Sequence, residues 1–211
     1  SYDIIGNIAV LNYKPKNIKV ITKKLLKYKN IKSVWLKIRI SGKLRLPKLK
    51  WLAGSKETEI LHKENGCLMK LDIKKCYFSP RLSNDRLEIV KSIRKKEKIL
   101  VLFSGIAPYA LVIAKNSKVK PKEIICIELN KTACKYAEEN FKLNKLYNIK
   151  IIQGDVKKVV PQLAKTKIKF DRIISARGQL EDLFLKETFM LSKKGSIIHF
   201  YDFLHEDEID D

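Results

Sequence analysis

Acidic residues are missing from the N-terminal quarter of this sequence. No Asp or Glu occurs between Ile4 and Lys56, whereas fifteen Lys and Arg fall in that stretch. A lysine-rich composition, with 38 Lys against 7 Arg in the whole chain, explains many basic residues but not so long an absence of acids. Binding to a phosphate backbone explains it, because each Lys or Arg that pairs with a phosphate releases counterions. Interleaved aromatic residues, which suit stacking on bases, strengthen this prediction of a nucleic-acid partner: Tyr13, Tyr28, Trp35 and Trp51.

Long apolar runs and paired cysteines are also missing. No run approaches the roughly 20 apolar residues that span a bilayer, and no signal peptide is visible, so we expect no membrane association and a cytoplasmic location. The four cysteines form no C-x-x-C pair, which favours reduced, packed thiols and no metal. A zinc site built from His62, Cys67 and Cys76 is the alternative. The chain begins at Ser1 rather than Met, as a fragment or a trimmed protein would.

The sequence divides into two parts near residue 75. Residues 1–75 hold 19 Lys and Arg against 5 Asp and Glu, and they predict a small α+β domain that contacts RNA. Its expected elements are a strand in 4–13, a basic amphipathic helix in 16–29, a strand in 34–40 and a hairpin in 59–73. Asn65-Gly66, in the middle of that hairpin, is a strong signal for a two-residue turn.

Residues 76–211 alternate between predicted helices and strands. Apolar strands are expected at 98–103, 123–129, 148–155, 171–175 and 195–203. Helices are expected at 86–96, after Gly105, at 132–144, at 156–163 and near 180–191. This alternation predicts a mostly parallel sheet with right-handed crossovers, as in the Rossmann-like α/β class.

Three strand ends of the predicted sheet carry features of a cofactor site. In open α/β sheets the ligand lies beyond the carboxyl ends of the strands. The first strand ends at Phe103, and Gly105 follows, where a backbone without a side chain allows close approach. The next ends at Glu128, a carboxylate suited to ribose hydroxyls, and the third at Asp155, placed to meet the edge of an adenine. Solvated loop acids are the alternative interpretation of Glu128 and Asp155.

The glycine-rich motifs that bind two common cofactors are absent from the sequence. The chain has no G-x-G-x-x-G, which argues against NAD, and no P-loop, which argues against ATP. The remaining arrangement is typical of methyltransferases that use S-adenosylmethionine (AdoMet). The predicted cofactor loop, within ILVLFSGIAPYALVIAK at 99–115, departs from the usual form at two places. Val101 stands where many such enzymes have an aspartate, and Ala107 where a second glycine is usual.

The text HKENGCLMKLDIKKCYFSPRLSNDR, residues 62–86, resembles the signature of the archaeal-type tRNA guanosine-37 N1-methyltransferases. The resemblance extends over nearly the whole chain, from SYDIIGNIAVL through LAG at 52–54 and KLNKL at 142–146 to GSIIHFYDF. It implies a class I AdoMet-dependent methyltransferase domain, here 76–211, preceded by the small α+β domain. It also implies an N-terminal tRNA-docking domain and a C-terminal segment that this sequence does not include.

The resemblance implies roles for individual residues. Asp85 falls on the family's catalytic carboxylate, where glutamate is usual, and a carboxylate there would remove the proton from guanine N1. Arg45 falls on an arginine that would stabilise charge on the guanine O6, and Tyr77 on a tyrosine that would confine an extruded base. Arg81 and Arg86 match two further substrate-binding arginines. The cofactor positions of the family fall on Phe103, Gly105, Pro108, Tyr109, Glu128 and Asp155.

Two positions depart from the family pattern or have another interpretation. The family often carries N-L-P after its fourth strand, whereas Ser175–Gln179 read S-A-R-G-Q, which makes Ser175 and Arg177 the substrate-binding candidates there. Asp85 also suits a helix N-cap, or a surface ion pair with Arg86.

The function implied by the resemblance is AdoMet-dependent methylation of N1 of guanosine at position 37, in the anticodon loop of tRNA. A subgroup with text similar to VLFSGIAPY and HFYDF also methylates carbon 7 of a wyosine precursor at the same position, which implies a possible second activity. An aminocarboxypropyl transferase of the same pathway and a non-catalytic tRNA-binding relative are the alternatives. We expect a monomer.

Overall fold

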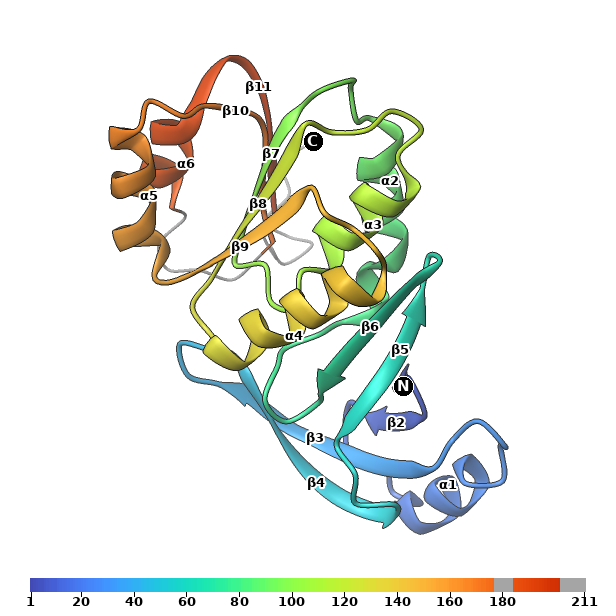
Figure 1. Cartoon of the computed structure of the whole chain (residues 1–211). Coiled ribbons are helices and arrows are strands. Elements are labelled where there is room, and N and C mark those ends of the chain that lie inside the picture. The colour runs from blue at the N-terminus through green and yellow to red at the C-terminus, as the bar shows by residue number, and fades with distance from the viewer. Residues whose placement is uncertain (177–183, 202–211) are drawn as a thin grey trace, which may run out of the picture.

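The computed structural model describes residues 1–176 and 184–201. In Figure 1 a small N-terminal sheet with one helix lies at one end, and a larger sheet flanked by helices lies at the other. The N-terminal sheet has the strand order β1-β2-β3-β4. Its bounds are β1 Tyr2–Ile5, β2 Ile8–Leu11, β3 Ser33–Ser41 and β4 Leu46–Gly54, with helix α1 at Ile18–Leu25. Leu25 of α1 packs with Ala9, Leu11 and Val34, so the basic face of the helix lies outward.

Residues 4–13, expected as one strand, form two. β1 and β2 pair antiparallel, with Ile5 opposite Ile8. The chain reverses at Gly6, whose φ of +58° is in the left-handed region that favours glycine. A Cβ atom at Gly6 would lie 2.9 Å from the carbonyl oxygen of Leu61, so glycine also allows the turn to approach the next hairpin.

The predicted hairpin at 59–73 is confirmed as β5, Glu59–Glu64, and β6, Cys67–Asp72. Asn65 and Gly66 both have positive φ, 49° and 74°, as a two-residue hairpin turn requires. The outer edge of β6 lies along helix α4, Lys131–Leu143, in the second part of the chain. The Asn140 side chain accepts from the Lys70 N–H (2.7 Å) and donates to its carbonyl (3.1 Å).

Asn144 repeats this arrangement one helical turn later. Its side chain accepts from the Leu68 N–H at 2.9 Å and donates to the Leu68 carbonyl at 2.7 Å. The hairpin, which the sequence grouped with residues 1–75, is therefore hydrogen-bonded to a helix of the second part.

We expect Asn140→Ala to lower the free energy of unfolding by about 2 kcal/mol, because the N–H and carbonyl of Lys70 lose their partner. Urea unfolding measures this change. Asn148→Ala is the matched control, since Asn148 makes one 3.3 Å hydrogen bond to Pro121, and it should cost less than about 0.5 kcal/mol. Equal stabilities of the two variants would contradict the role of Asn140.

The larger sheet has five parallel strands in the order β11-β10-β7-β8-β9. The strands are β7 Lys98–Leu102, β8 Glu123–Glu128, β9 Ile149–Gln153, β10 Phe170–Ser175 and β11 Ser192–Phe200. The helices are α2 Ser83–Lys91, α3 Pro108–Asn116, α4, α5 Val156–Lys165 and α6 Leu185–Leu191, with a 3₁₀ turn, η1, at Pro80–Leu82. The predicted fold class, a Rossmann-like α/β domain after a small sheet domain, is confirmed.

Alternate residues of the central strand pack on opposite faces of this sheet. Ile99 and Val101 join the core formed with α2, α3 and α4. Leu100 and Leu102 join the core formed with α5 and α6. Val101 thus occupies a core position and is fully buried, which explains the apolar residue where an aspartate is usual.

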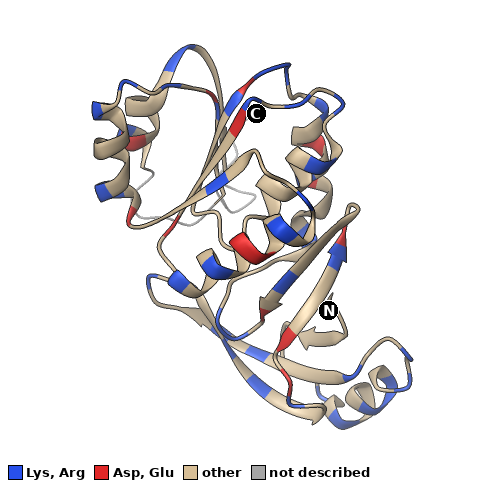
Figure 2. Cartoon of the chain, in the orientation of Figure 1, with Lys and Arg blue, Asp and Glu red and all other residues tan. Residues whose placement is uncertain are grey.

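Charge and cysteines follow the sequence pattern. Figure 2 shows Lys and Arg but no acid from β2 through β4, so this stretch of the N-terminal sheet and its helix is basic. The four cysteines are buried and form no disulfide. Burial raises the pKa of the Cys67 thiol to about 11, which keeps it protonated at neutral pH. Within 1–176 and 184–201, no helix is long and apolar enough to cross a membrane.

Candidate functional site

A cavity of about 910 Å³, its open mouth included, lies at the carboxyl ends of β7, β8 and β9. Seven of the predicted site residues line it: Arg45, Tyr77, Phe103, Gly105, Tyr109, Glu128 and Asp155. Ten further residues complete the wall: Lys43, Leu44, Leu82, Leu129, Asn130, Ala133, Gly154, Val156, Ala176 and Tyr201. Strand ends that are far apart in the sequence meet here because the sheet is parallel.

Glu128 connects two loops at the base of the cavity. Its Oε2 accepts from the Gly105 N–H at 2.8 Å, and its Oε1 accepts from the Asn130 N–H at 2.7 Å. Asn130 then caps α4, since its side chain accepts from Thr132 N–H. Glu128 is therefore held in place by backbone donors and is not a freely solvated loop acid.

The loop before α3 takes an unusual conformation. Phe103, Gly105 and Ala107 all have left-handed φ values, 55°, 57° and 64°. Ala107 adopts the backbone conformation for which a second glycine is usual, and Pro108 is the first residue of the helix that follows. Pro108 does not line the cavity but sets where α3 begins.

Asp155 connects the cavity to the N-terminal domain. Its Oδ1 caps α5 by accepting from the Lys157 N–H at 3.0 Å, and its Oδ2 lies 2.6 Å from the Lys43 ammonium. This hydrogen bond from Lys43 holds the pKa of Asp155 below its usual value. Lys43 lies in the β3–β4 connection, which reaches the N-terminal end of α4 in Figure 1.

The sequence pattern missed this contribution of the β3–β4 connection, because β4 itself was not expected. Lys43, Leu44 and Arg45 are the residues of 1–58 that line the cavity. The available signal was Gly42, which separates two runs of alternating apolar residues and has a φ of +72°.

Asp85 lies behind the wall of the cavity, in the first turn of α2. Its Oδ2 accepts from the hydroxyls of Tyr109, at 2.5 Å, and Tyr201, at 2.7 Å. Both tyrosines line the cavity. Burial, and next the hydrogen bond to Asp85, raises the pKa of each tyrosine, so both hydroxyls are donors at neutral pH.

Neither alternative for Asp85 is found. The N-cap of α2 is Leu82, and no side chain caps the helix. Arg86 forms its ion pair with Glu64 instead, through two hydrogen bonds of 2.7 and 2.6 Å. Tyr201, which sequence reasoning missed, lies in the HFYDF text and joins β11 to this site.

The predicted arginines occupy three different surroundings. The Arg45 guanidinium lies 4.9 Å from the ring centre of Tyr77, a cation–π contact in the cavity wall. Arg81 donates to Asp3 at 2.8 Å, outside the cavity lining. Arg86 is 1% exposed and occupied by Glu64, so the structure does not bring it to the cavity.

Residues 175–179 are the segment that departs from the N-L-P pattern of the family, and the structure describes only Ser175 and Ala176 of it. Ser175 ends β10 and is buried, and within the described residues its hydroxyl has no hydrogen-bond partner. Ala176 lines the cavity. Arg177 lies outside the described residues.

Comparison with known proteins identifies the family. Residues 60–210 match the TRM5/TYW2 methyltransferase domain. This chain belongs to the TRM5/TYW2 methyltransferase family. Its residues 1–58 match the TYW2 N-terminal domain of the same family. The two matched domains thus meet before the β5–β6 hairpin, whereas our division at 1–75 and 76–211 stays a prediction.

Several TRM5/TYW2 relatives are closely similar. The chain is 36% identical to the tRNA (guanine(37)-N(1))/4-demethylwyosine(37)-methyltransferase Taw22 of Nanoarchaeum equitans, over 100% of the chain and 86% of Taw22. It is 35% identical to the tRNA (guanine(37)-N(1))-methyltransferase Trm5b of Pyrococcus abyssi, over 96% of the chain. The chain spans only 60% of that relative's length.

Solved structures of the TRM5/TYW2 family have the same fold. The complex of aTrm5 with tRNALeu superposes with a TM-score of 0.82 at 30% identity, over 96% of this chain and 59% of aTrm5. TYW2 of Methanocaldococcus jannaschii in complex with AdoMet superposes with a TM-score of 0.70 at 30% identity, over 98% of this chain and 78% of that one.

The cavity has the chemistry that AdoMet requires. Glu128 and Asp155 offer carboxylates at adjacent strand ends, and Leu129 and Val156 offer apolar side chains beside them. Gly105 lines the cavity with backbone alone, and its φ of +57° is in the left-handed region that favours glycine. The residues present therefore fit the cofactor of this family.

Proposed function

We propose that this protein is an AdoMet-dependent tRNA methyltransferase that acts on N1 of guanosine at position 37. The observation that carries the proposal is the mixed wall of the cavity. Arg45 comes from the basic N-terminal domain, contacts Tyr77, and lines the same cavity as the strand ends that carry Glu128 and Asp155. RNA bound to the basic end can therefore present a base where a methyl donor is held.

The cofactor residues would hold the adenosine part of AdoMet. Glu128 would accept from the ribose hydroxyls, and Asp155 would accept from the adenine amino group, with Lys43 sharing that carboxylate. AdoMet supplies an electrophilic methyl group on a positively charged sulfur. Positioning is the main task of these residues, because the transfer needs no covalent bond to the enzyme.

Asp85 would act as the general base. Guanine N1 carries a proton and is a poor nucleophile, so the proton must leave as the methyl group arrives. Tyr109 and Tyr201 both donate to Oδ2 of Asp85, and their hydroxyls orient the carboxylate. The proton would pass from N1 to Asp85 directly or by a relay. In the relay, one tyrosine hydroxyl accepts the proton from N1 and gives its own proton to Asp85, so the tyrosine stays neutral.

Arg45 and Tyr77 would hold the target base. The Arg45 guanidinium is a fixed cation that would stabilise negative charge on the guanine O6 as N1 loses its proton. Tyr77 would stack on the base once it has left the anticodon loop. Arg81, whose side chain is 56% exposed, would contact the RNA backbone, with Ser175 and Arg177 as further substrate-binding residues. Residues 1–75 would supply most of the RNA contacts. The protein would act as a monomer in the cytoplasm.

Incubation of the protein with labelled AdoMet and a tRNA transcript tests the proposal. We expect label in transcripts with guanosine at position 37 and none when adenosine replaces it. Calorimetry in parallel establishes that AdoMet binds. No transfer under conditions where AdoMet is bound would overturn the proposal and favour a tRNA-binding relative without catalysis.

A second candidate is transfer of the aminocarboxypropyl group of AdoMet to the same tRNA position. Residues 1–58 match the TYW2 N-terminal domain, and a Methanocaldococcus jannaschii relative at 33% identity is named as such a transferase. Asp85 beside the cavity favours methylation instead. Mass spectrometry of the modified nucleoside distinguishes the two groups by mass, and a wyosine-precursor tRNA tests the second methylation on carbon 7.

A further inference from the structure

A second cavity adjoins the cofactor cavity at Tyr77. It has a volume of about 970 Å³ with its mouth and shares Tyr77 and Leu82 with the first cavity. Its other residues come from the N-terminal sheet, from the end of the β5–β6 hairpin and from the segment up to η1. Tyr77 and Leu82 are therefore the residues at which the two cavities meet.

The lining of the second cavity is largely apolar, with a charged group at one side. Val10, Leu49, Ile73 and Phe78 are among its apolar residues. The side chains in its lining that carry a charge at neutral pH are Asp3, Lys37 and Arg81, and they are linked. Arg81 donates to Asp3, Asn12 donates to the other Asp3 oxygen, and Lys37 donates to Asn12.

Two cations against one carboxylate leave this group positive. Arg81 uses its Nε on Asp3, and its side chain is 56% exposed, so the guanidinium faces solvent beside an apolar hollow. An apolar hollow with an exposed cation beside it suits a nucleotide, because the base is buried while its phosphate meets the positive charge.

We propose that the second cavity binds the nucleobase next to the target base in the anticodon loop. This inference rests on the proposed function, which places the target base against the Tyr77 face of the first cavity. An RNA strand that passes Tyr77 would then place one base in the first cavity and the neighbouring base in the second. The neutral polar side chains among its lining residues are Ser79, Tyr77 and the weakly polar Cys76, and an otherwise apolar lining on which bases stack accepts either a purine or a pyrimidine.

Two isoleucines of β3 give a matched test. Ile40 lines the second cavity, whereas Ile38, two residues away, is 52% exposed and lines neither of the two cavities. The probe is an anticodon stem-loop RNA with 2-aminopurine directly before or directly after the target guanosine. Its fluorescence reports binding and stacking without any need for methyl transfer.

We expect the fluorescence to change at one of the two positions with wild-type protein and with Ile38→Trp. Ile40→Trp fills the cavity, so the change should be lost and the RNA Kd should rise about tenfold to a hundredfold, the loss of one stacked base. AdoMet binding should be equal in all three proteins. If Ile40→Trp does not fold, Ile40→Glu with Ile38→Glu as control makes the same comparison.

Three results would overturn the inference. One is an unchanged fluorescence at both positions with wild-type protein, and another is equal weakening by the Ile38 and Ile40 variants. The third is a change of oligomeric state in Ile40→Trp with RNA binding unaltered, which would assign the cavity to a second copy of the chain. Methyl transfer by the wild-type protein in any of these cases would leave the proposed function standing.

Discussion

Asp85→Asn should lower the single-turnover rate of methyl transfer by about 10²–10⁴-fold and leave the affinities for AdoMet and tRNA within about threefold. The asparagine oxygen still accepts from Tyr109 and Tyr201, so the surroundings of the side chain are preserved. The amide cannot take a proton, so the variant removes the proposed base and little else. Rapid-quench measurement with enzyme in excess over tRNA isolates the transfer from product release.

The matched control is Glu88→Gln, the same change of carboxylate to amide one turn later on α2. Glu88 is 66% exposed and pairs with Lys91, away from the cavity. It should transfer methyl groups at the wild-type rate. Asp85→Glu should keep much of the activity, because it restores a carboxylate with one more methylene. A full rate in Asp85→Asn would remove Asp85 from the chemistry and leave it a structural partner of the two tyrosines.

Glu128→Gln should weaken AdoMet binding by about a hundredfold. The two carboxylate oxygens accept from two backbone N–H groups, of Gly105 and Asn130. An amide presents one NH₂ group to one of these donors, so one of the two loops is no longer held in its binding conformation, and a hydrogen bond from the ligand to a charged acceptor, worth about 1.5–3 kcal/mol, is also lost. The ribose hydroxyls lose the same charged acceptor. Calorimetric titration with AdoMet measures the change in Kd.

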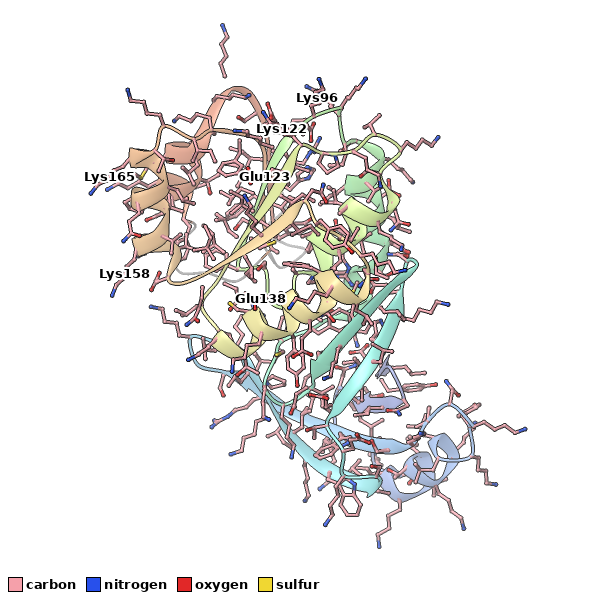
Figure 3. The ribbon with its side chains drawn as sticks, in the orientation of Figure 1. Lys96, Lys122, Glu123, Glu138, Lys158 and Lys165 are labelled. Carbon is pink, nitrogen blue, oxygen red and sulfur yellow. The ribbon has the colours of Figure 1, made fainter. Side chains whose placement is uncertain are left out.

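Glu123→Gln is the control at the opposite end of the same strand. Glu123, labelled in Figure 3, begins β8 and pairs with Lys150 at 2.8 Å, whereas Glu128 ends the strand. Its AdoMet affinity should equal that of the wild type. If both variants bound AdoMet normally, the assignment of the ribose contact to Glu128 would fail, whereas weak binding in both would point to a general loss of stability.

The parallel sheet could be predicted from local pattern. Its three inner strands, β7, β8 and β10, are short apolar runs buried on both faces, and helices alternate with the strands along the chain, so the class follows from local pattern and order. The hairpin at Asn65-Gly66 is equally local, since two adjacent residues set the turn. The β4 strand was missed because none of its residues is fully buried and Pro47 interrupts its apolar alternation.

The cofactor carboxylates were also visible in the sequence, because strand ends of a parallel sheet meet at one edge. Glu128 and Asp155 line the cavity as expected. The surroundings of Asp85 were not visible, since its two tyrosine donors lie 24 and 116 residues away. Arg86 illustrates the same limit, because its partner Glu64 comes from the β5–β6 hairpin.

The sequence by itself determined the fold class, the basic N-terminal end and the strand-end residues of the cofactor cavity, because periodicity, charge and strand order are local properties of the chain. The tertiary structure alone decided which residues of the N-terminal half reach that cavity. Lys43 meets Asp155 and Arg45 meets Tyr77 across long separations in the chain. Contacts of this kind depend on where the tertiary fold places the β3–β4 connection relative to the strand ends of the larger sheet, and no local pattern of residues encodes that placement.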